Sequence, residues 1–520
     1  MDASSQSNRL ALVVDGIPVD VADDGSSLLD VLRDQLGNRS PKDGCSPQGQ
    51  CGCCTVLVDG QPRVACVTPA RRMQGRAITT AEGLPAAVRD RWAAAFCATG
   101  ASQCGFCTPG IVCRFEGLRA KHPAADHAAV EQALLAHLCR CTGWRTLLDA
   151  WDIAQGDDAI PPRDLDGATA RARLETGGPQ RVAPVVALGH GGFSDDTAPP
   201  DALVAIPDGS GGWAIGATLV EARALAGKVQ GRRTTVDARP PLEVPPGSWA
   251  ATLRTSWVEP AYLEPDASWC DPGGEPHSPL ANGGAFGGKL HSAVGAAARS
   301  LADEHGRAVR VLLDREDVVR LGPKRPPVAG GADPDGRGIL RVVRTAGIAA
   351  AIAAVAPAIV VEEVDVAGPP TSADLRAAGW AEAAVLLAGA RGAAGSMTDP
   401  HTGAIAEAEV TGDRILVRVD AGDPIDPVVL RSYATGAAHM ALSWLSREGI
   451  AVDAAGTVHD LTIRSFGVLR SVDTPPIEVE ITPSRAQPVR GGDAVFAAVA
   501  AAAWRHLGCP TDWPTGARWR

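Results

Sequence analysis

Residues 44–56 read GCSPQGQCGCCTV, residues 103–110 read QCGFCTPG and residues 138–144 read LCRCTGW. Closely spaced thiols on glycine-bearing loops, which leave backbone N–H groups free, are typical of segments that converge on a metal centre. The cysteine total of 13 is odd, and residues 1–16 show no export signal, which argues against a disulfide framework. We therefore expect most of these thiols to be metal ligands in a cytoplasmic protein.

The first cysteine motif has nearly the spacing of a plant-type ferredoxin, C-x4-C-x2-C with a distant fourth cysteine. Five residues separate Cys45 from Cys51, two separate Cys51 from Cys54, and Cys66 follows at a distance. The loop is thus one residue longer than the ferredoxin pattern. Cys53 is an additional thiol that we do not expect to bind metal.

A second group of thiols consists of two short pairs, Cys104 with Cys107 and Cys139 with Cys141. Four thiolates that arrive from two loops can hold a second [2Fe–2S] centre, whereas zinc also accepts four cysteines in paired spacings. Spacing alone favours iron–sulfur and leaves zinc open. The remaining cysteines have no partner spacing and are expected to be small buried hydrophobic residues: Cys97, Cys113, Cys270 and Cys509.

The residues around the first motif alternate between apolar and polar side chains, as in β-hairpins. Residues 9–21 alternate around Asp15-Gly16, and residues 55–66 alternate around Asp59-Gly60, a turn pair that favours two-residue hairpin loops. Between the two hairpins, Ser27 precedes an amphipathic pattern and predicts a capped helix. Hairpin, helix and hairpin together predict a β-grasp, ferredoxin-like domain.

The rest of the chain divides by pattern into further units of an α+β protein. Helical spacing replaces strand alternation after the first unit, and a stretch rich in Asp, Pro and Gly then predicts a linker. We expect a ferredoxin-like domain at 1–80, a small helical bundle at 81–154, a linker at 155–212, and an α+β region in two parts at 213–330 and 331–520.

Composition bears on the partners. The 49 Lys and Arg against 60 Asp and Glu give a net charge of −11, which is unfavourable for binding nucleic acid or an anionic membrane. The longest apolar stretch, residues 346–361, falls short of the ~20 residues that span a bilayer. We expect no nucleic-acid partner and no membrane.

At its three cysteine motifs the chain resembles the two-cluster iron–sulfur subunit of the xanthine dehydrogenase and aldehyde oxidase family, the molybdenum hydroxylases. The resemblance favours iron over zinc. It implies that an outer cluster is bound by Cys45, Cys51, Cys54 and Cys66, and an inner cluster by Cys104, Cys107, Cys139 and Cys141. In this family the inner cluster lies near the pterin of the molybdenum cofactor. Gln103 matches a residue that contacts the pterin.

The second half is similar, in scattered segments, to the family's large molybdopterin subunit. Residues 282–289, NGGAFGGK, match a loop at the metal, which implies cofactor contacts for Gly284, Phe286 and Gly287. Arg376 resembles a cofactor-binding arginine. Asp493, in RGGD, takes the place of the family's glutamate, the general base. An aspartate is one methylene shorter, and a displacement of ~1 Å can lower a rate ~10²-fold.

The segment after the linker is less than half as long as the family's large subunit, and two cofactor-binding stretches are missing. The favoured hypothesis is therefore an electron-transfer subunit fused to a shortened, non-catalytic region that docks a separate catalytic chain. The alternatives are a compact active hydroxylase with Asp493 as base, and an iron–sulfur redox sensor or scaffold protein.

The resemblance also implies cofactors and partners. We expect two [2Fe–2S] clusters here, with the molybdopterin cofactor possible in this chain but more expected in a partner. Either enzyme hypothesis implies oxidative hydroxylation of a heterocycle or aldehyde with oxygen from water. No G-x-G-x-x-G fingerprint follows a strand, so a separate FAD subunit or another acceptor would complete a hetero-oligomer.

Overall fold

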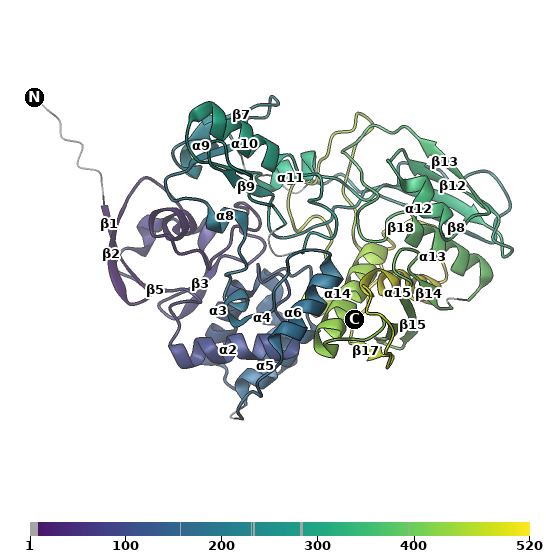
Figure 1. The fold of residues 1–520 in the computed structure, drawn as a ribbon, viewed down its shortest axis with the longest axis horizontal. Helices are drawn as coiled ribbons and strands as arrows, with labels where there is room; N and C mark the ends of the chain where they lie inside the picture. Colours follow the sequence, from purple (N-terminus) through teal and green to yellow (C-terminus); the bar gives the residue numbers. More distant parts are fainter. Residues whose placement is uncertain (1–8, 157, 230, 232–233, 281–283, 394) are drawn as a thin grey trace, which may run out of the picture.

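The computed structural model describes residues 9–156, 158–229, 231, 234–280, 284–393 and 395–520. In Figure 1 the cysteine-rich unit lies at the left, a small sheet with α9 and α10 lies above it, and the C-terminal part lies at the right. The cysteine-rich unit packs directly against later parts of the chain, because Leu263, Ile450 and Phe466 belong to the same buried cluster as its side chains. The fold is a mixture of α and β elements, as expected.

The first sheet contains both predicted hairpins. Its order is β2-β1-β5-β3-β4, with β1 (Arg9–Val14), β2 (Ile17–Ala22), β3 (Thr55–Val58), β4 (Gln61–Val64) and β5 (Ala77–Thr79). Asp15 and Gly16 have φ values of 51° and 80°, which a two-residue turn of this kind requires.

The predicted capped helix lies between these hairpins and begins at Ser27. Ser27 and Asp30 cap each other, and α1 (Leu28–Asp30) continues as a π-helical turn, η1 (Val31–Gln35). Two short 3-10 helices follow β4: η2 (Ala65–Val67) and η3 (Ala70–Met73).

The second unit is the expected helical bundle. It contains α2 (Ala86–Thr99), α3 (Thr108–Lys121), α4 (His127–Ala133), η4 (Leu134–Ala136) and α5 (Arg145–Gln155). Trp92 lies at its centre, with ring centroids 5.4 Å from Phe115 and 6.0 Å from Trp151. These contacts hold α2, α3 and α5 together and fix the loops that carry the second group of thiols.

The stretch expected to be a linker, residues 155–212, has regular structure. It forms α6 (Leu165–Thr176), α7 (Pro184–Ala187), α8 (Ser194–Thr197) and the strand β6 (Leu203–Pro207). The simple picture of a linker is therefore wrong in two respects. The helix α6 buries the ion pair of Arg171 and Glu175, and β6 pairs with β10 of the following unit.

A small sheet of order β7-β6-β10-β9 follows. Its further elements are β7 (Trp213–Gly216), α9 (Leu219–Leu225), β9 (Ala267–Cys270), α10 (Val294–His305), β10 (Val309–Leu312) and α11 (Arg315–Leu321). The side chain of Thr218 caps α9 by accepting from the N–H group of Glu221.

The expected boundary at residue 330 falls inside a strand. A sheet of order β13-β12-β11-β8-β18 combines β8 (Ala251–Thr255), β11 (Val328–Ala332), β12 (Gly338–Val343), β13 (Ile359–Val364) and β18 (Asp512–Trp513). Because β8 and β18 pair across this position, the segments 213–330 and 331–520 are not separate domains.

The last sheet, β14-β15-β16-β17, is packed against two long helices. Its strands are β14 (Met397–Thr398), β15 (Ile405–Thr411), β16 (Arg414–Asp420) and β17 (Ile477–Ile481). The helices of this part are α12 (Ile348–Ala353), α13 (Trp380–Arg391), α14 (Pro427–Ser446), the short η5 (Ser471–Asp473) and α15 (Gly492–His506). In the described part of the chain, no helix combines the length and the apolar character needed to cross a bilayer.

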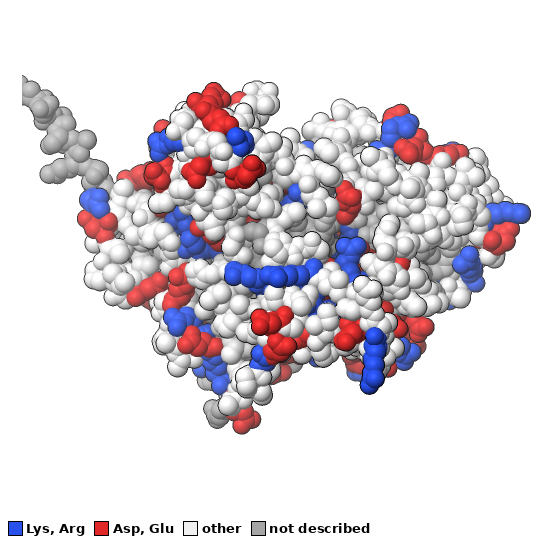
Figure 2. All heavy atoms as spheres, in the orientation of Figure 1, with Lys and Arg blue, Asp and Glu red and all other residues white. Residues whose placement is uncertain are grey.

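Buried ion pairs connect the cysteine-rich unit to the rest. Arg140, which lies between Cys139 and Cys141 in the sequence, forms a bidentate ion pair with Glu448. Its Nη2 lies 2.8 Å from Glu448 Oε2, and both side chains are at most 5% exposed. Arg33 contacts Asp195 at 2.7 Å. On the face drawn in Figure 2, by contrast, acidic and basic side chains are interspersed.

Candidate functional site: two sets of thiols and a cavity beside them

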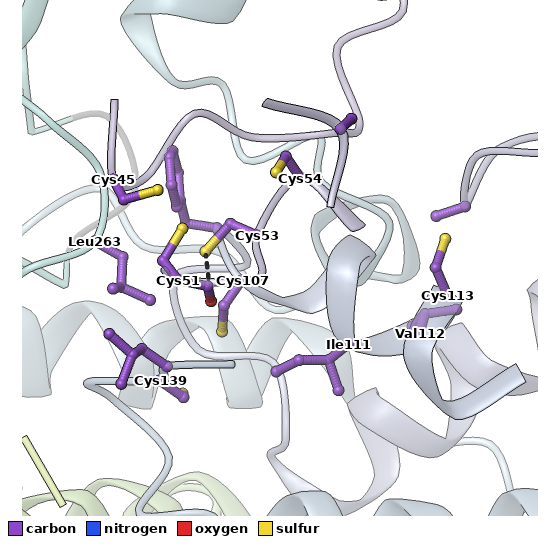
Figure 3. Packing of buried hydrophobic residues seen from close by; sticks show 14 of the residues in the cluster. Cys45, Cys51, Cys53, Cys54, Cys107, Ile111, Val112, Cys113, Cys139 and Leu263 are labelled. Carbon is purple, nitrogen blue, oxygen red and sulfur yellow. Dashed lines mark hydrogen bonds between the residues drawn. The ribbon is translucent and has the colours of Figure 1, made fainter. Parts of the chain in front are cut away.

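The four expected ligands of the first group lie next to one another. Cys45, Cys51 and Cys54 lie on the loop before β3, and Cys66 lies on η2, and none is more than 5% exposed. Hydrogen bonds between thiols join Cys45 to Cys51 and to Cys66, and Cys66 to Cys54. Figure 3 shows Cys45, Cys51 and Cys54 from close by. We call these four residues the outer set.

Backbone amides support the sulfurs of the outer set. The N–H groups of Gln48 and Gln50 donate to Cys45 Sγ at 3.2 and 3.4 Å, and that of Cys66 donates to Cys54 Sγ at 3.5 Å. Hydrogen bonds from the Cys51 thiol and then the Cys66 thiol hold the pKa of Cys45 well below its usual value. Both effects favour the thiolate at Cys45, the form that binds iron, whereas the same thiol contacts raise the pKa of Cys51 and Cys66.

The longer spacing between Cys45 and Cys51 does not prevent contact between these two thiols. Ser46 turns the loop directly after Cys45 with a φ of 46°. Its hydroxyl donates to Asp314 at 3.1 Å and accepts from Arg223 at 2.9 Å, and Arg223 also contacts Asp43 at 3.1 Å. This anchored turn fixes the loop from outside the ferredoxin-like unit.

The other four expected ligands form two pairs, and we call Cys104, Cys107, Cys139 and Cys141 the inner set. Cys141 Sγ lies 3.7 Å from Cys104 Sγ. A hydrogen bond from the Cys107 thiol, the largest effect, lowers the pKa of Cys139 to about 6. Two thiolates for each of two irons is the ligand set of a [2Fe–2S] cluster. In the residues that the structure describes, no group of three or more His, Cys, Asp or Glu side chains is arranged to hold a metal ion.

The two sets touch through backbone. The Leu138 N–H, next to Cys139, donates to the Cys51 carbonyl oxygen at 3.0 Å. The Cys53 thiol faces the same carbonyl at 3.8 Å, as the dashed line in Figure 3 shows. A Cβ on Gly110 would lie 2.3 Å from the Gly52 carbonyl oxygen, so only glycine lets α3 pack this closely on the first motif.

Five of the six other expected site residues line one cavity of about 160 Å³: Gly284, Phe286, Gly287, Arg376 and Asp493. The wall of this cavity lies against the inner set, because a Cβ on Gly284 would be 3.2 Å from Cys104 Sγ and 3.5 Å from Cys141 Sγ. Phe286 has a φ of 49°, the left-handed conformation that non-glycine residues rarely adopt. Residues 282 and 283 of the glycine-rich motif lie outside the described residues.

Ion pairs occupy both oxygens of Asp493. Oδ1 lies 3.2 Å from Arg376 Nε, and Oδ2 lies 3.2 Å from Arg490 Nη2. The Arg376 guanidinium also stacks over the Phe286 ring at 4.6 Å. Burial is the main effect that lowers the pKa of Arg376, and the Asp493 carboxylate opposes it.

Gln103, the sixth expected residue, does not line this cavity. Its amide donates to the Cys141 carbonyl at 3.0 Å and to Ser432 Oγ at 2.9 Å. The lining residues that sequence reasoning missed include Glu175, Tyr433 and Arg490. Arg490 was within the RGGD motif, whereas Glu175 lies in the stretch expected to be a linker.

These residues do not fit a pterin dinucleotide. Pockets for ligands of drug size have volumes of about 300 to 1,000 Å³, well above that of this cavity. The carboxylate of Asp493 is bound by two guanidinium groups, and the Gln103 side chain is used within the protein. In contrast, the thiol sets fit iron–sulfur clusters in number and pairing.

Comparison with protein families finds two matches in the cysteine-rich unit. Residues 12–77 match the 2Fe-2S iron-sulfur cluster binding domain, and residues 80–152 match the [2Fe-2S] binding domain. Both thiol sets lie within these ranges.

Several curated proteins are similar over the same part of the chain. One of the nicotinate dehydrogenase subunits of Pseudomonas putida is 39% identical over 134 residues, 25% of this chain and 85% of that protein. The nicotinate dehydrogenase small FeS subunit of Eubacterium barkeri is 36% identical, with 24% and 79% covered. For the aldehyde oxidoreductase of Megalodesulfovibrio gigas the identity is 40%, but only 16% of that longer protein is covered.

The likeness in structure extends over the whole chain. The aldehyde oxidoreductase of Desulfovibrio desulfuricans superposes with a TM-score of 0.68 and 14% identity, covering 95% of this chain and 97% of that one. At this identity the comparison shows the fold alone. Because the superposition covers almost the whole chain, it gives the part after α5 the same fold as that oxidoreductase as well.

Proposed function

Because the chain belongs to the xanthine dehydrogenase and aldehyde oxidase family of molybdenum hydroxylases, we propose that it is the electron-transfer subunit of such an enzyme. One relative that it covers over most of its length is a small FeS subunit, which supports this role. Two bound [2Fe–2S] clusters would supply one-electron transfer between a molybdenum centre in a partner chain and a flavin or other acceptor. The complex would then be a hetero-oligomer.

In this proposal the outer set binds one cluster and the inner set binds the other. The contact of Leu138 N–H with the Cys51 carbonyl carries the proposal, since it joins a residue of the outer set to the neighbour of Cys139 by a single hydrogen bond. Cys53 would remain unligated, because its thiol faces this carbonyl.

The surroundings of each set suggest a direction for the electrons. The inner set lies against the cavity at Gly284, where the family places its cofactor. The outer set adjoins the surface at Val67, a 51% exposed residue next to Cys66. We therefore propose that electrons reach the inner set first and leave from the outer one.

The ligand assignment is tested by replacing one cysteine of each set in the full chain. Cys66→Ser should remove one of two paramagnetic signals of the reduced protein, and Cys141→Ser should remove the other. Cys113→Ser is the matched control, since Cys113 is equally buried but belongs to neither set. Electron paramagnetic resonance reads all three. Loss of the same signal in both ligand variants, or loss of one in the control, would refute the assignment.

The active-hydroxylase alternative has less support in this chain. A general base must reach the proton that it removes, and Asp493 is held by Arg376 and Arg490. We therefore assign oxidative hydroxylation of a heterocycle or aldehyde to the proposed partner chain.

A further inference from the structure

The helix α6 builds one wall of the cavity beside the inner set. Glu175, Thr176, Gly177 and Gly178, at the end of α6 and just after it, line this cavity. These residues belong to the segment that connects the cysteine-rich unit to the rest of the chain, so the connection itself forms part of the wall of this cavity.

Glu175 fixes the turn that carries Asp493. Its two carboxylate oxygens accept from the N–H groups of Gly491 and Gly492 at 3.1 and 3.2 Å. Arg171, four residues earlier on α6, forms an ion pair with Glu175 and donates to the Val489 carbonyl at 2.9 Å. Both α6 side chains are at most 3% exposed, so this attachment is shielded from water.

From this turn, a continuous series of contacts leads to the inner set. Asp493 pairs with Arg376, whose guanidinium stacks on Phe286. The Phe286 loop in turn places Gly284 against the sulfurs of the inner set.

A second contact from the same segment reaches the inner set directly. The side chain of Gln180, which is fully buried, donates to the backbone carbonyl of Gln103, next to Cys104. The Gln103 amide itself donates to the Cys141 carbonyl and to Ser432. Thus the chain's own atoms use the polar groups beside the inner set that a bound cofactor would need.

We infer that α6 and residues 177–180 form a built-in plug, which seals the inner set and excludes the molybdenum cofactor from this chain. The cavity of about 160 Å³ that remains has room for water molecules. Water there would give a hydrogen-bond partner to the buried Tyr433 hydroxyl, which has none within the described residues. This inference rests on the proposed function only in that the inner set holds a cluster.

Cofactor uptake gives the first test. The full chain is produced in cells that make the molybdenum cofactor, with excess molybdate, and iron, molybdenum and released pterin are measured per chain. The plug predicts iron for two clusters with molybdenum and pterin near background. Near one molybdenum and one pterin per chain would overturn the plug and leave the clusters standing, whereas absence of iron would instead refute the proposed function and, with it, the plug.

Access to the inner cluster gives the second test. Glu175→Ala should detach the turn at residues 491–492, so that in air the inner-cluster signal decays several-fold faster than in the wild type while the outer-cluster signal decays at its usual rate. Arg173→Ala, on the exposed side of α6, is the control and should behave as the wild type. Equal decay in Glu175→Ala and wild type would refute the plug.

A third variant keeps the test available if Glu175→Ala does not fold or bind iron. Asp493→Asn keeps the side-chain shape but weakens the pairs with Arg376 and Arg490. The same selective, faster decay is expected, although smaller. If Glu175→Ala binds no iron, an unchanged decay in Asp493→Asn decides against the plug.

Discussion

Gly52, in the first cysteine motif, and Gly110, in QCGFCTPG, lie in close contact. Gly110→Ala should lower the free energy of unfolding by about 1 to 3 kcal/mol, because its Cβ would be forced against backbone that cannot move away. This outweighs the gain of about 1 kcal/mol that alanine normally brings to a helix interior. Chemical denaturation and iron content measure the effect.

Gly156→Ala is the matched control for this prediction. A Cβ at Gly156 would find no atom nearer than 3.8 Å, so the variant should keep the wild-type unfolding midpoint and iron content. Equal stability of the two alanine variants would show that the close approach at Gly110 does not limit packing.

His439, on α14, makes stability depend on pH. Burial is the main effect that lowers its pKa to about 3 from the usual 6.5, since the folded interior disfavours the charged ring. Below pH 6.5 the unfolded chain binds a proton that the folded chain does not, so stability falls as the pH falls from 6.5 toward 3. From pH 7 to pH 5 this residue should cost about 2 kcal/mol.

The variant His439→Gln isolates this contribution. Its amide can still donate to the Leu469 carbonyl, which lies 3.0 Å from His439 Nε2, but it does not titrate. The difference in unfolding free energy between pH 7 and pH 5 should therefore shrink by about 2 kcal/mol. An unchanged difference would show that His439 can charge within the fold.

At the scale of elements, strong local signals predicted the cysteine-rich unit well. The turn pairs Asp15-Gly16 and Asp59-Gly60 lie in hairpins, and Ser27 caps its helix. These features depend on interactions within a few residues, which the sequence displays directly. That most of the predicted helix is a π-helical turn could not be read from its apolar spacing.

Elements that depend on distant partners were missed. The helix α6 looked polar because it buries the charged residues Arg171 and Glu175, whose partners lie near residue 490. Likewise β11, VAGGA, has two glycines and weak strand propensity. A Cβ on Gly331 would lie 2.2 Å from the Trp249 ring, so glycine there serves packing that no local pattern reveals.

In the candidate site, too, some residues could be predicted from the sequence and others only from the folded structure. Short cysteine spacings within the loops indicated the thiol sets. Family resemblance brought together Phe286, Arg376 and Asp493, which do line one cavity. The resemblance could not indicate which residues of the connecting segment form the wall of that cavity. The roles of Glu175 and Gln180 follow from tertiary contacts alone.

At the scale of the whole molecule, the buried pair of Arg140 and Glu448 connects the inner set to the C-terminal half. Glu448→Gln leaves a buried guanidinium without its counter-charge, so the free energy of unfolding should fall by about 3 to 5 kcal/mol. The denaturation midpoint and the inner-cluster signal should both report the loss.

An exposed pair provides the comparison. Glu480, which is 3.0 Å from Arg418 on the surface of the last sheet, is well exposed, and Glu480→Gln should change stability by at most about 1 kcal/mol. Similar effects of the two glutamine variants would mean that the Arg140 pair does not hold the two halves together.

The claim that this chain carries two [2Fe–2S] clusters is tested most directly by one measurement. Iron, acid-labile sulfide and zinc are determined per polypeptide on the full chain purified without oxygen, with paramagnetic resonance of the reduced sample. Two clusters predict about four irons, about four sulfides and two distinct signals. Zinc in stoichiometric amount with little iron would contradict the claim.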